Sequence, residues 1–392
     1  MKIGLFNDSF PPTIDGVANT VKNYADILSA HGDTPVVVTP KYPNITDSYP
    51  YEVYRYSSLK FKGKMPYRVG NCFEPKAIHE LYYENFDLMH VHCPFASALL
   101  AKQINIRAGK KRIPTVFTYH TKFDIEINKY VKFEQFEKIC NKFIMNNIKI
   151  ADEVWAVTNG AGKWLQKAGY KGDYVVMPNG TDFRKGVAEA SEVKRIKDFW
   201  KIGDEKVMLF VGRMMWHKNA KLIIDTVKKL SVTDLKFKMV FVGDGVDRVA
   251  IEEYARQTGV SDRCVFTGAV YDRAALRTYY SMADIFFFPS TFDTSGLVVK
   301  EAAACKCPSL LIKDSCAAEG NRDGFSCVIS EENADDCAEK LYKVLKDDDL
   351  LEVLGENAYE HVYLSWEDAV SFARRRYEKV IEEFNSAHPI RR

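Results

Sequence analysis

The stretch "FDTSGLVVKEAAACKCP" at residues 292–308 decides the fold. It follows "ADIFFFPS" (283–290), an apolar aromatic run typical of a buried strand, and it contains the helical run "LVVKEAAA" (297–304). A strand that passes through a short turn directly into a helix is the repeating unit of a parallel α/β sheet. The turn at Ser295 and Gly296 leaves unpaired backbone N–H groups at the start of the helix. The stretch therefore predicts a parallel sheet with a polar turn at the end of a strand.

The same succession of strand, glycine or polar turn and amphipathic helix recurs along the chain. Strands are expected at 2–6, 35–39, 88–92, 115–120, 153–158 and 174–178, and, after the polar stretch 183–204, at 207–212, 239–245, 264–268, 285–290 and 308–312. Helices between the first strands are expected at 17–31, 133–150 and 160–168. The pattern predicts an α/β fold of two doubly wound, Rossmann-like domains.

Length supports this division, because 392 residues exceed one ordinary core and suit two domains of about 150 to 200 residues each. We expect an N-terminal domain at 1–190, a C-terminal domain at 191–365 and a final helix at 366–392, with Ser365 as a possible N-cap, that packs back on the N-terminal domain. Ligands of open parallel sheets bind beyond the carboxyl ends of the strands, so the two domains are expected to face a cleft.

Composition excludes several classes of protein. The longest apolar runs have about six residues, against roughly 20 in a membrane-spanning helix. The N-terminus lacks the basic start and apolar segment of a secretory signal, which favours the cytosol. The formal net charge is only +2 and no basic stripe with interleaved aromatics is present, so nucleic acid is not an expected partner. The nine cysteines show no zinc spacing and lie mostly in apolar segments, which favours reduced, packed thiols.

Two cations follow the first strand of the second domain, in "FVGRMMWHKN" (210–219). Gly212 frees the backbone, and Arg213 and Lys218 stand five residues apart near the entrance of the next helix. The planar guanidinium of an arginine and the flexible ammonium of a lysine can both bind the oxygens of a diphosphate. A solvated basic turn is the alternative for this fragment taken alone.

The stretch at 292–308 adds an anion site. Unpaired N–H groups at a helix N-terminus bind phosphates. Glu301, further along that helix, suits vicinal hydroxyls such as those of a ribose, and Asp293, on the loop, reaches another part of the same ligand. The alternative is an N-terminal acid that favours the helix dipole together with a surface glutamate.

Taken together, these motifs resemble the retaining glycosyltransferases of family 4 (GT4), which have the two-domain GT-B fold and an E-x7-E segment after a "P-S" strand end. Here that segment reads Asp293-x7-Glu301. The likeness covers nearly the whole chain, through "MKIGLFNDSFPPTIDGVANTV", "HVHCPFASALLAK", "TVFTYHTKF", "VMPNGTDF", "FVGRMMWHKN", "VFVGDG", "VFTGAV" and "YYSMADIFFFPST".

The resemblance implies a role for each matching residue. Arg213 and Lys218 would hold the donor diphosphate, Glu301 the ribose and Asp293 the transferred sugar. Phosphates and sugar hydroxyls would meet the backbone of Thr294, Ser295, Gly296, Leu297 and Val298.

In the first domain, Gly16 would allow a phosphate or sugar to approach closely, and its alternative is a plain helix-entry glycine. His120, at a strand end, would lie near the donor sugar as a catalytic residue, whereas His90 and His92 are expected to be structural.

Two positions depart from the family pattern. Asp293 is one methylene shorter than the usual glutamate, which can change the hexose that fits. Lys306 replaces a usual glycine, so the turn before Pro308 is not expected to need a positive φ.

The implied reaction transfers a hexose, glucose from UDP-glucose being the first choice, to a hydroxyl of a lipid such as diacylglycerol. Two cations and a helix N-terminus would stabilise the leaving diphosphate without a metal or cofactor, since no D-x-D pair follows a strand. With no carboxylate placed as a covalent nucleophile, the resemblance implies retention by same-face attack.

Two alternatives stay open. The acceptor can be a soluble sugar or polysaccharide precursor, or the chain can be a non-catalytic subunit that binds a sugar nucleotide. An epimerase or oxidoreductase is disfavoured, because the first strand is not followed by G-x-G-x-x-G.

Charge distribution suggests where a lipid acceptor would be met. Residues 1–190 carry 25 Lys or Arg against 19 Asp or Glu, and the remainder carries 30 against 34. Within the first part, 54–68 and 128–149 interleave lysines with apolar and aromatic residues, as an interfacial surface does. We therefore expect peripheral binding to the anionic inner face of a membrane, with a solvated face over a normal core as the alternative.

Overall fold

The computed structural model describes residues 1–13, 15–60, 68–121 and 134–389 of the 392-residue chain. The chain forms two compact units, one of residues Met1–Asn179 with Trp366–Arg392 and the other of residues Gly180–Ser365. Each unit is built around its own parallel sheet.

The first unit contains a seven-stranded parallel sheet in the order β3-β2-β1-β6-β7-β8-β9. Its strands are β1 (Lys2–Phe6), β2 (Thr34–Pro40), β3 (Glu52–Tyr56), β6 (Leu88–Val91), β7 (Thr115–Tyr119), β8 (Glu153–Ala156) and β9 (Val175–Val176). A separate antiparallel hairpin pairs β4 (Ser58–Lys60) with β5 (Arg68–Gly70). The inner strands are buried on both faces, which explains their continuous apolar runs.

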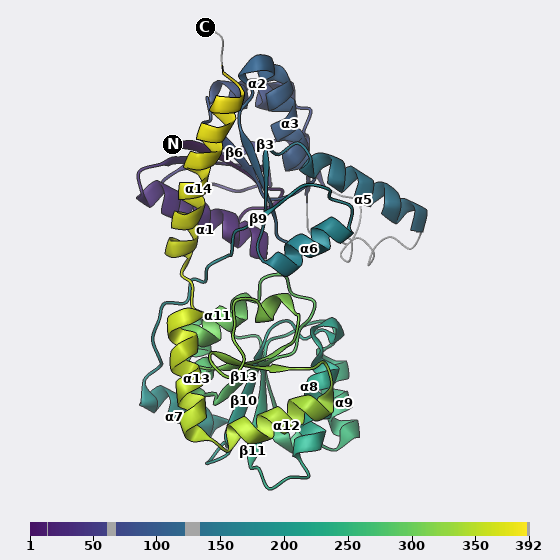
Figure 1. The fold of residues 1–392 in the computed structure, drawn as a ribbon, viewed down its shortest axis with the longest axis vertical. Coiled ribbons are helices and arrows are strands. Elements are labelled where there is room, and N and C mark those ends of the chain that lie inside the picture. The colour runs from purple at the N-terminus through teal and green to yellow at the C-terminus, as the bar shows by residue number, and fades with distance from the viewer. Residues whose placement is uncertain (14, 61–67, 122–133, 390–392) are drawn as a thin grey trace. The chain divides into compact units, whose positions relative to one another are not determined.

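Helices cover this sheet. They are α1 (Gly16–Ala30), α2 (Pro75–Tyr83), α3 (Ala96–Ala108), α5 (Glu134–Ile148), α6 (Asn159–Lys167) and, from the far end of the chain, α14 (Trp366–Ala387), with a short 3-10 turn η1 (Gly109–Lys111). The yellow α14 runs alongside α1 in Figure 1 and contacts it. The Tyr377 hydroxyl of α14 lies 2.6 Å from the Nδ1 of His90, which places the last helix inside the packing of the first unit.

The second unit contains a six-stranded parallel sheet in the order β12-β11-β10-β13-β14-β15. Its strands are β10 (Lys206–Val211), β11 (Phe237–Val242), β12 (Cys264–Gly268), β13 (Ile285–Phe288), β14 (Ser309–Ile312) and β15 (Cys327–Ser330). Its helices are α7 (Ala190–Phe199), α8 (Ala220–Leu230), α9 (Arg248–Thr258), α10 (Arg273–Met282), α11 (Leu297–Ala304), α12 (Ala334–Leu345) and α13 (Asp348–His361), with 3-10 turns η2 (Trp216–Lys218), η3 (Ser261–Arg263) and η4 (Cys316–Ala318).

The strand order of the second unit reverses direction at β10, which lies between β11 and β13. Ligands of doubly wound sheets bind at such a switch point, beyond the carboxyl ends of the strands. The loops after β10 and β13 are the ones that carry Arg213, Lys218 and Asp293. The topology of this unit therefore brings the predicted donor residues to the expected edge of the sheet.

The predicted α/β fold of two doubly wound, Rossmann-like halves is confirmed. Two strands of the parallel sheets were not predicted, β3 and β15. β3 mixes apolar with charged residues, and the apolar run of β15 is only three residues long. The division between the units falls at residues 179 and 180, not at 190. The reason is that Thr181 pairs with Ser365 and Phe183 packs in the second core, so the segment after Asn179 already belongs to the second unit.

The expectation that Lys306 needs no positive φ is wrong. Lys306 has a φ of 58°, a left-handed conformation that costs a residue with a side chain about 1–2 kcal/mol. It follows α11, where its N–H donates to the carbonyl of Ala303 and closes the helix end. Its carbonyl lies 2.3 Å from where a Cβ on Gly355 would stand, and its ammonium pairs with Glu356. Packing of the turn against α13 thus holds the backbone in the conformation that a glycine would adopt more easily.

Candidate functional site

The loop after β10 carries the two predicted cations in different environments. Arg213 is exposed, whereas Lys218, the last residue of η2, is buried. The backbone of this loop lies against the loop after β11, because a Cβ on Gly243 would stand 1.9 Å from the carbonyl oxygen of Gly212. Since only glycine allows that approach, the two loops are held together at the sheet edge.

Lys218 and Asp293 form an ion pair within the second unit. The Lys218 Nζ lies 2.7 Å from Oδ1 and 2.9 Å from Oδ2 of Asp293, and the Ser290 hydroxyl donates to Oδ2 at 2.5 Å. Burial favours the protonated carboxyl, but Lys218, Ser290 and the charge of Arg213 outweigh it and lower the pKa of Asp293. The family resemblance implies that the two side chains bind different parts of a ligand, but in the structure they contact each other.

The turn before α11 has the geometry of an anion site. Gly296 has a φ of 56° and occupies the N-cap, where it has no side chain to cap the helix. The buried Oγ of Ser295 has no hydrogen-bond partner within the described part of the chain. An orphan hydroxyl at the start of a helix is a group that a bound oxyanion would satisfy, so the turn at Ser295 and Gly296 fits the role assigned to it.

A substitution at Gly296 tests how strictly this turn is specified. We expect Gly296→Ala to lower both thermal stability and turnover, because it adds the left-handed penalty of about 1–2 kcal/mol and a clash of the new Cβ with Ala317 at 2.9 Å. Gly324→Ala is the matched control, since Gly324 has a φ of 68° and open space around its Cβ position. Thermal melts and kinetics should show a larger loss for Gly296. Equal effects of both substitutions would contradict a tightly packed turn.

Glu301 is buried in α11 and not on the surface. Its Oε1 accepts a hydrogen bond from Arg273 at 3.0 Å and its Oε2 accepts one from the Tyr280 hydroxyl at 2.9 Å. Burial raises the pKa of Glu301, and Arg273 and Tyr280 oppose that rise. Each carboxylate oxygen has a second lone pair, so a hydroxyl of a ligand can still be accepted. Neither Arg273 nor Tyr280 was assigned a role from the sequence. Arg273 lies outside the quoted motifs, and Tyr280, although it lies within "YYSMADIFFFPST", meets Glu301 only in the tertiary structure.

The predicted residues of the first unit lie after β1 and β7. Gly16 is the exposed first residue of α1, and nothing described lies within 4 Å of where its Cβ would be, so a ligand can approach there. His120 is buried, and its Nε2 lies 3.0 Å from the Nδ1 of His92. Burial lowers the pKa of His120 to about 3, so the ring is neutral at physiological pH. A neutral imidazole can donate or accept a hydrogen bond but carries no charge.

His90 and His92 belong to a buried polar network of the first unit. His90 is held between the hydroxyls of Tyr377 and Thr118, each at 2.6 Å from a ring nitrogen. Its ring is tilted by 41° relative to that of His92, with 3.8 Å between the centroids. The contacts of His90 are internal to the fold, while His92 contacts the predicted site residue His120 directly.

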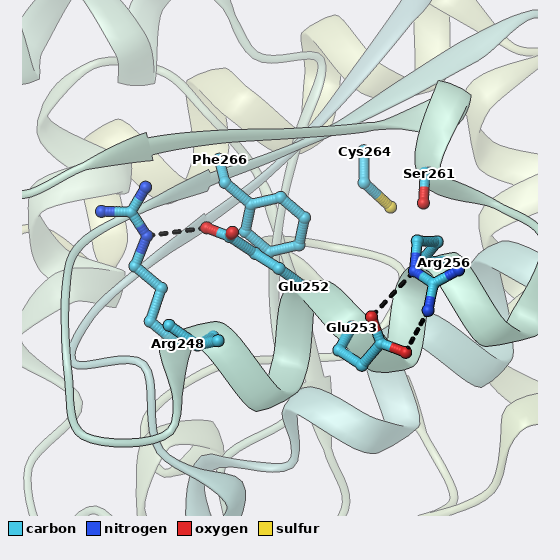
Figure 2. A pocket seen from close by; sticks show the side chains of 8 residues that line it. Arg248, Glu252, Glu253, Arg256, Ser261, Cys264 and Phe266 are labelled. Carbon is cyan, nitrogen blue, oxygen red and sulfur yellow. Dashed lines mark hydrogen bonds and ion pairs between the residues drawn. The ribbon is translucent and has the colours of Figure 1, made fainter.

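An open pocket lies elsewhere on the second unit, between α9 and β12 (Figure 2). It has a volume of about 540 Å³ and contains none of the predicted site residues. Arg248 pairs with Glu252, and Arg256 pairs with Glu253, so the charges at its wall are already neutralised. Phe266 and Cys264 line it further. Nothing in this lining favours a charged ligand.

Within the described ranges, no group of three or more His, Cys, Asp or Glu side chains is arranged to hold a metal ion. None of the described helices is both long and apolar enough to cross a bilayer.

Two family models match consecutive parts of the chain. One described as Glycosyltransferase Family 4 matches residues 14–185, and one described as Glycosyl transferases group 1 matches residues 192–361. The first match spans the first sheet except for β1, and the second match spans all strands of the second sheet.

Curated relatives are distant but span most of the chain. An alpha-monoglucosyldiacylglycerol synthase of Acholeplasma laidlawii is 24% identical over 91% of this chain and 92% of that protein. A synthase of the same name from Streptococcus pneumoniae is 24% identical over 79% of this chain and 70% of that protein. The N-acetyl-alpha-D-glucosaminyl L-malate synthase of Bacillus anthracis is 25% identical over 78% of this chain and 75% of that protein.

Solved structures share the fold at low sequence identity. The sucrose-phosphate synthase of Thermosynechococcus elongatus superimposes with a TM-score of 0.76 at 20% identity and covers 97% of this chain and 99% of that chain. The Anabaena protein HepE in complex with UDP has a TM-score of 0.74 at 18% identity, with 97% of this chain and 99% of that chain covered. Together with the family matches, these likenesses show that the chain is a glycosyltransferase of the GT-B fold, in which a Glycosyltransferase Family 4 domain is followed by a group 1 domain.

Proposed function

We propose that this glycosyltransferase transfers glucose from UDP-glucose to a hydroxyl of diacylglycerol with retention of anomeric configuration. The main support for binding of a nucleotide-sugar donor is the cluster of residues at the carboxyl ends of β10 and β13. There the Lys218–Asp293 pair, the exposed Arg213 and the orphan Ser295 hydroxyl lie on adjacent strand ends of one sheet. Cations and unpaired donors of this kind stabilise a diphosphate.

The chemistry follows from the charges that the reaction creates. The bond between the anomeric carbon and the diphosphate oxygen breaks, negative charge collects on the leaving phosphate, and the sugar becomes positively charged. Arg213, Lys218 and the N-terminus of α11 would stabilise the phosphate. The acceptor hydroxyl attacks from the same face and gives its proton to the leaving phosphate oxygen. Two side-chain cations would take the place of a metal, and His120 would donate a hydrogen bond near the sugar.

The acceptor is proposed from the relatives and from the surface of the first unit. Two curated relatives are named as synthases of a glucosyldiacylglycerol. On the β4–β5 hairpin, Leu59 and Val69 are cross-strand neighbours with exposed fractions of 76% and 51%, and both strands carry basic residues beside them. On α5, Ile139 and Phe143 are one turn apart and exposed. Exposed apolar residues beside cations suit an anionic lipid surface.

The two segments predicted to meet a membrane are only partly described. Residues 61–67 of the first segment (54–68) and residues 128–133 of the second (128–149) lie outside the described residues. The described part of the proposed membrane-binding surface consists of the strands β4 and β5 and the helix α5.

A donor and acceptor panel tests the proposed reaction. Nucleotide release is measured for four donors: UDP-glucose, UDP-galactose, GDP-mannose and UDP-GlcNAc. Each donor is combined with dioleoylglycerol in mixed vesicles, with a water-soluble acceptor or with no acceptor. Each measurement is made with and without EDTA. We expect release of UDP from UDP-glucose to rise with the lipid and to be unaffected by EDTA. Faster release with L-malate or another soluble acceptor would support the second candidate, which the Bacillus anthracis relative favours. Complete loss of activity in EDTA would contradict the metal-free mechanism.

Vesicle binding is a separate expectation. Co-sedimentation should increase with the fraction of anionic phospholipid and decrease at high salt, because each basic side chain near the surface contributes about 1 kcal/mol that salt screens. Serine substitutions of Leu59 and Val69 should reduce binding. The matched control replaces Val246 and Val249, which are similarly exposed on the second unit. Absence of binding to anionic vesicles at low salt would refute the membrane surface.

A further inference from the structure

Asn219 is the left-handed residue that ends the η2 turn directly after Lys218. Its φ of 61° and ψ of 32° lie in the region that asparagine tolerates better than most residues with a side chain. It also stands at the N-cap of α8, where asparagine usually accepts a hydrogen bond from the first turn of the helix, but its side chain makes no such bond. Because the side chain does not cap α8, its amide is used in contacts with other segments.

The amide of Asn219 is used in contacts with two other segments. Its Nδ2 donates to the carbonyl of Pro289 at 2.9 Å and to Oε1 of Glu332 at 2.6 Å. Pro289 follows β13, and Glu332 lies between β15 and α12. The loop after β10 is therefore tied to the ends of two further strands of the same sheet. Pro289 is adjacent to Ser290, whose hydroxyl binds Asp293.

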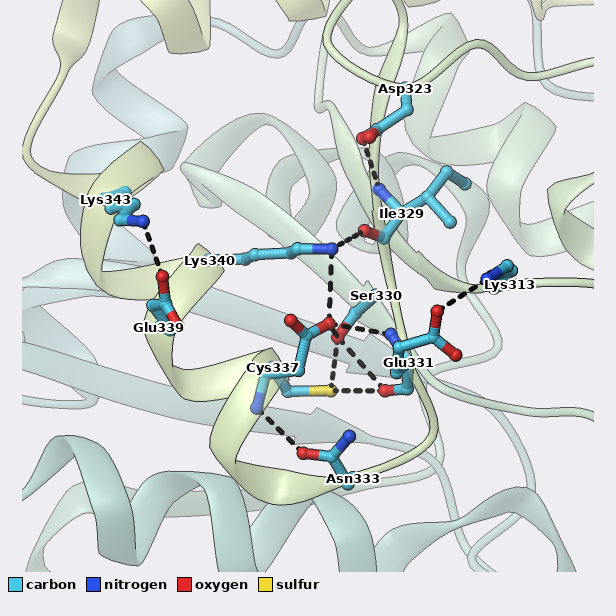
Figure 3. Close-up of polar contacts among 11 residues, drawn as sticks. Lys313, Asp323, Ile329, Ser330, Glu331, Asn333, Cys337, Glu339, Lys340 and Lys343 are labelled. Atoms are coloured by element: carbon cyan, nitrogen blue, oxygen red, sulfur yellow. Dashed lines mark hydrogen bonds and ion pairs between the residues drawn. The ribbon is translucent and has the colours of Figure 1, made fainter.

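The turn that carries Glu332 is itself held firmly (Figure 3). The Ser330 hydroxyl donates to Oδ2 of Asp336 at 2.7 Å, and the N–H of Asp336 donates to Asn333 at 2.9 Å. Lys340 reaches the carbonyl of Ile329 at 2.5 Å, which ties α12 to the end of β15. These bonds hold the backbone on both sides of Glu332, whose carboxylate accepts from Asn219.

We propose that Asn219 and Glu332 are positioning residues for Lys218. The hydrogen bonds of Asn219 to Glu332 and to the Pro289 carbonyl, here called the clamp, hold the η2 turn against the ends of β13 and β15. The ammonium of Lys218 is thereby kept in contact with Asp293, where it can bind the diphosphate. Lys218 and Asn219 are consecutive, so any shift of the asparagine backbone moves the stem of the lysine. This inference deepens the proposed function and rests on it for the identity of the ligand, but the placement of Lys218 is measurable without a ligand.

Four variants separate the clamp from general stability. Asn219→Gly keeps the left-handed backbone and removes both amide bonds. Glu332→Ala removes one acceptor, while Glu332→Gln retains an oxygen that can accept. Glu331→Ala is the matched control, because the neighbouring Glu331 pairs with Lys313 and does not contact Asn219. We expect Asn219→Gly and Glu332→Ala to lower kcat with UDP-glucose about ten- to a hundred-fold at unchanged melting temperature. Glu332→Gln and Glu331→Ala should stay near the wild type.

A second readout needs no donor. The proteins are labelled with acetic anhydride and the acetylation rate of Lys218 is measured by peptide mass spectrometry. In the wild type the buried, paired ammonium should react slowly. The rate should rise several-fold in Asn219→Gly and Glu332→Ala but not in Glu331→Ala, and Glu332→Ala should add little to Asn219→Gly, because both remove the same contact.

The outcomes distinguish the two proposals. Increased labelling in a protein that turns over no nucleotide sugar would uphold the clamp and refute the proposed function. Unchanged labelling in Asn219→Gly would overturn the clamp, whatever the kinetics. Equal labelling increases in Glu332→Ala and Glu331→Ala would also overturn it, because they would show a general effect of lost surface charge.

Discussion

Replacing Lys218 with alanine is expected to lower turnover by at least two orders of magnitude. Loss of one preorganised donor to a developing negative charge typically costs about a hundred- to a thousand-fold in kcat. The Arg213→Ala variant should show a loss of the same kind, since its exposed guanidinium is available to the diphosphate. The measurement is kcat with UDP-glucose and the lipid acceptor. Lys221→Ala is the matched control, because Lys221 lies three residues on and pairs with Asp225 on the outside of α8.

Stability must be separated from catalysis in this experiment. Lys218→Ala leaves the Asp293 carboxylate without its cation, and breaking a buried pair in this way costs up to about 3–5 kcal/mol. The double variant with Asp293→Asn removes that unpaired charge, so it should regain melting temperature without regaining turnover. Near-normal rates in both Lys218→Ala and Arg213→Ala would contradict the donor site. Recovery of turnover in the double variant would show that Lys218 serves only to neutralise Asp293.

The second large effect is a division of roles between Glu301 and Asp293. Glu301→Gln should weaken UDP binding by about ten-fold or more, because a hydrogen bond to a charged group contributes about 1.5–3 kcal/mol. The same substitution weakens the bond from Arg273, which keeps its second partner, Asp182. Asp293→Asn should leave UDP affinity nearly unchanged and lower kcat by a hundred-fold or more, since its proposed contact is to the sugar. Calorimetry with UDP alone and steady-state kinetics measure the two quantities.

The contrast between the two variants is the decisive result. Glu339→Gln, an exposed acid on α12 that pairs with Lys343, serves as the control for a lost surface charge. If both site variants lost UDP affinity equally, the assignment of one acid to the ribose and the other to the sugar would fail. Asp293 also pairs with Lys218, so the Asp293→Asn substitution weakens the contact that holds the Lys218 ammonium. Unchanged UDP affinity in this variant is therefore a demanding requirement.

Sequence alone determined the succession of strands and helices, and with it the fold. Runs such as 285–290 are apolar without alternation because parallel strands are buried on both faces, and each is followed by a turn and a helical pattern. These are local signals, carried by neighbours in the chain. They were sufficient to place Arg213, Lys218 and Asp293 after the strands that turn out to flank the switch point. They were weakest for β3 and β15, which are short and mix apolar with polar residues.

Tertiary structure alone decided which of these side chains contact each other. Lys218 and Asp293 are 75 residues apart, and Arg273 and Glu301 are 28 apart, so no local pattern could reveal either pair. The left-handed backbone of Lys306 is likewise set by packing against α13. The physical reason is common to these cases. Local preferences for strand, turn and helix are summed along the chain, whereas an ion pair or a strained turn is stabilised by groups that meet only once the sheet has formed.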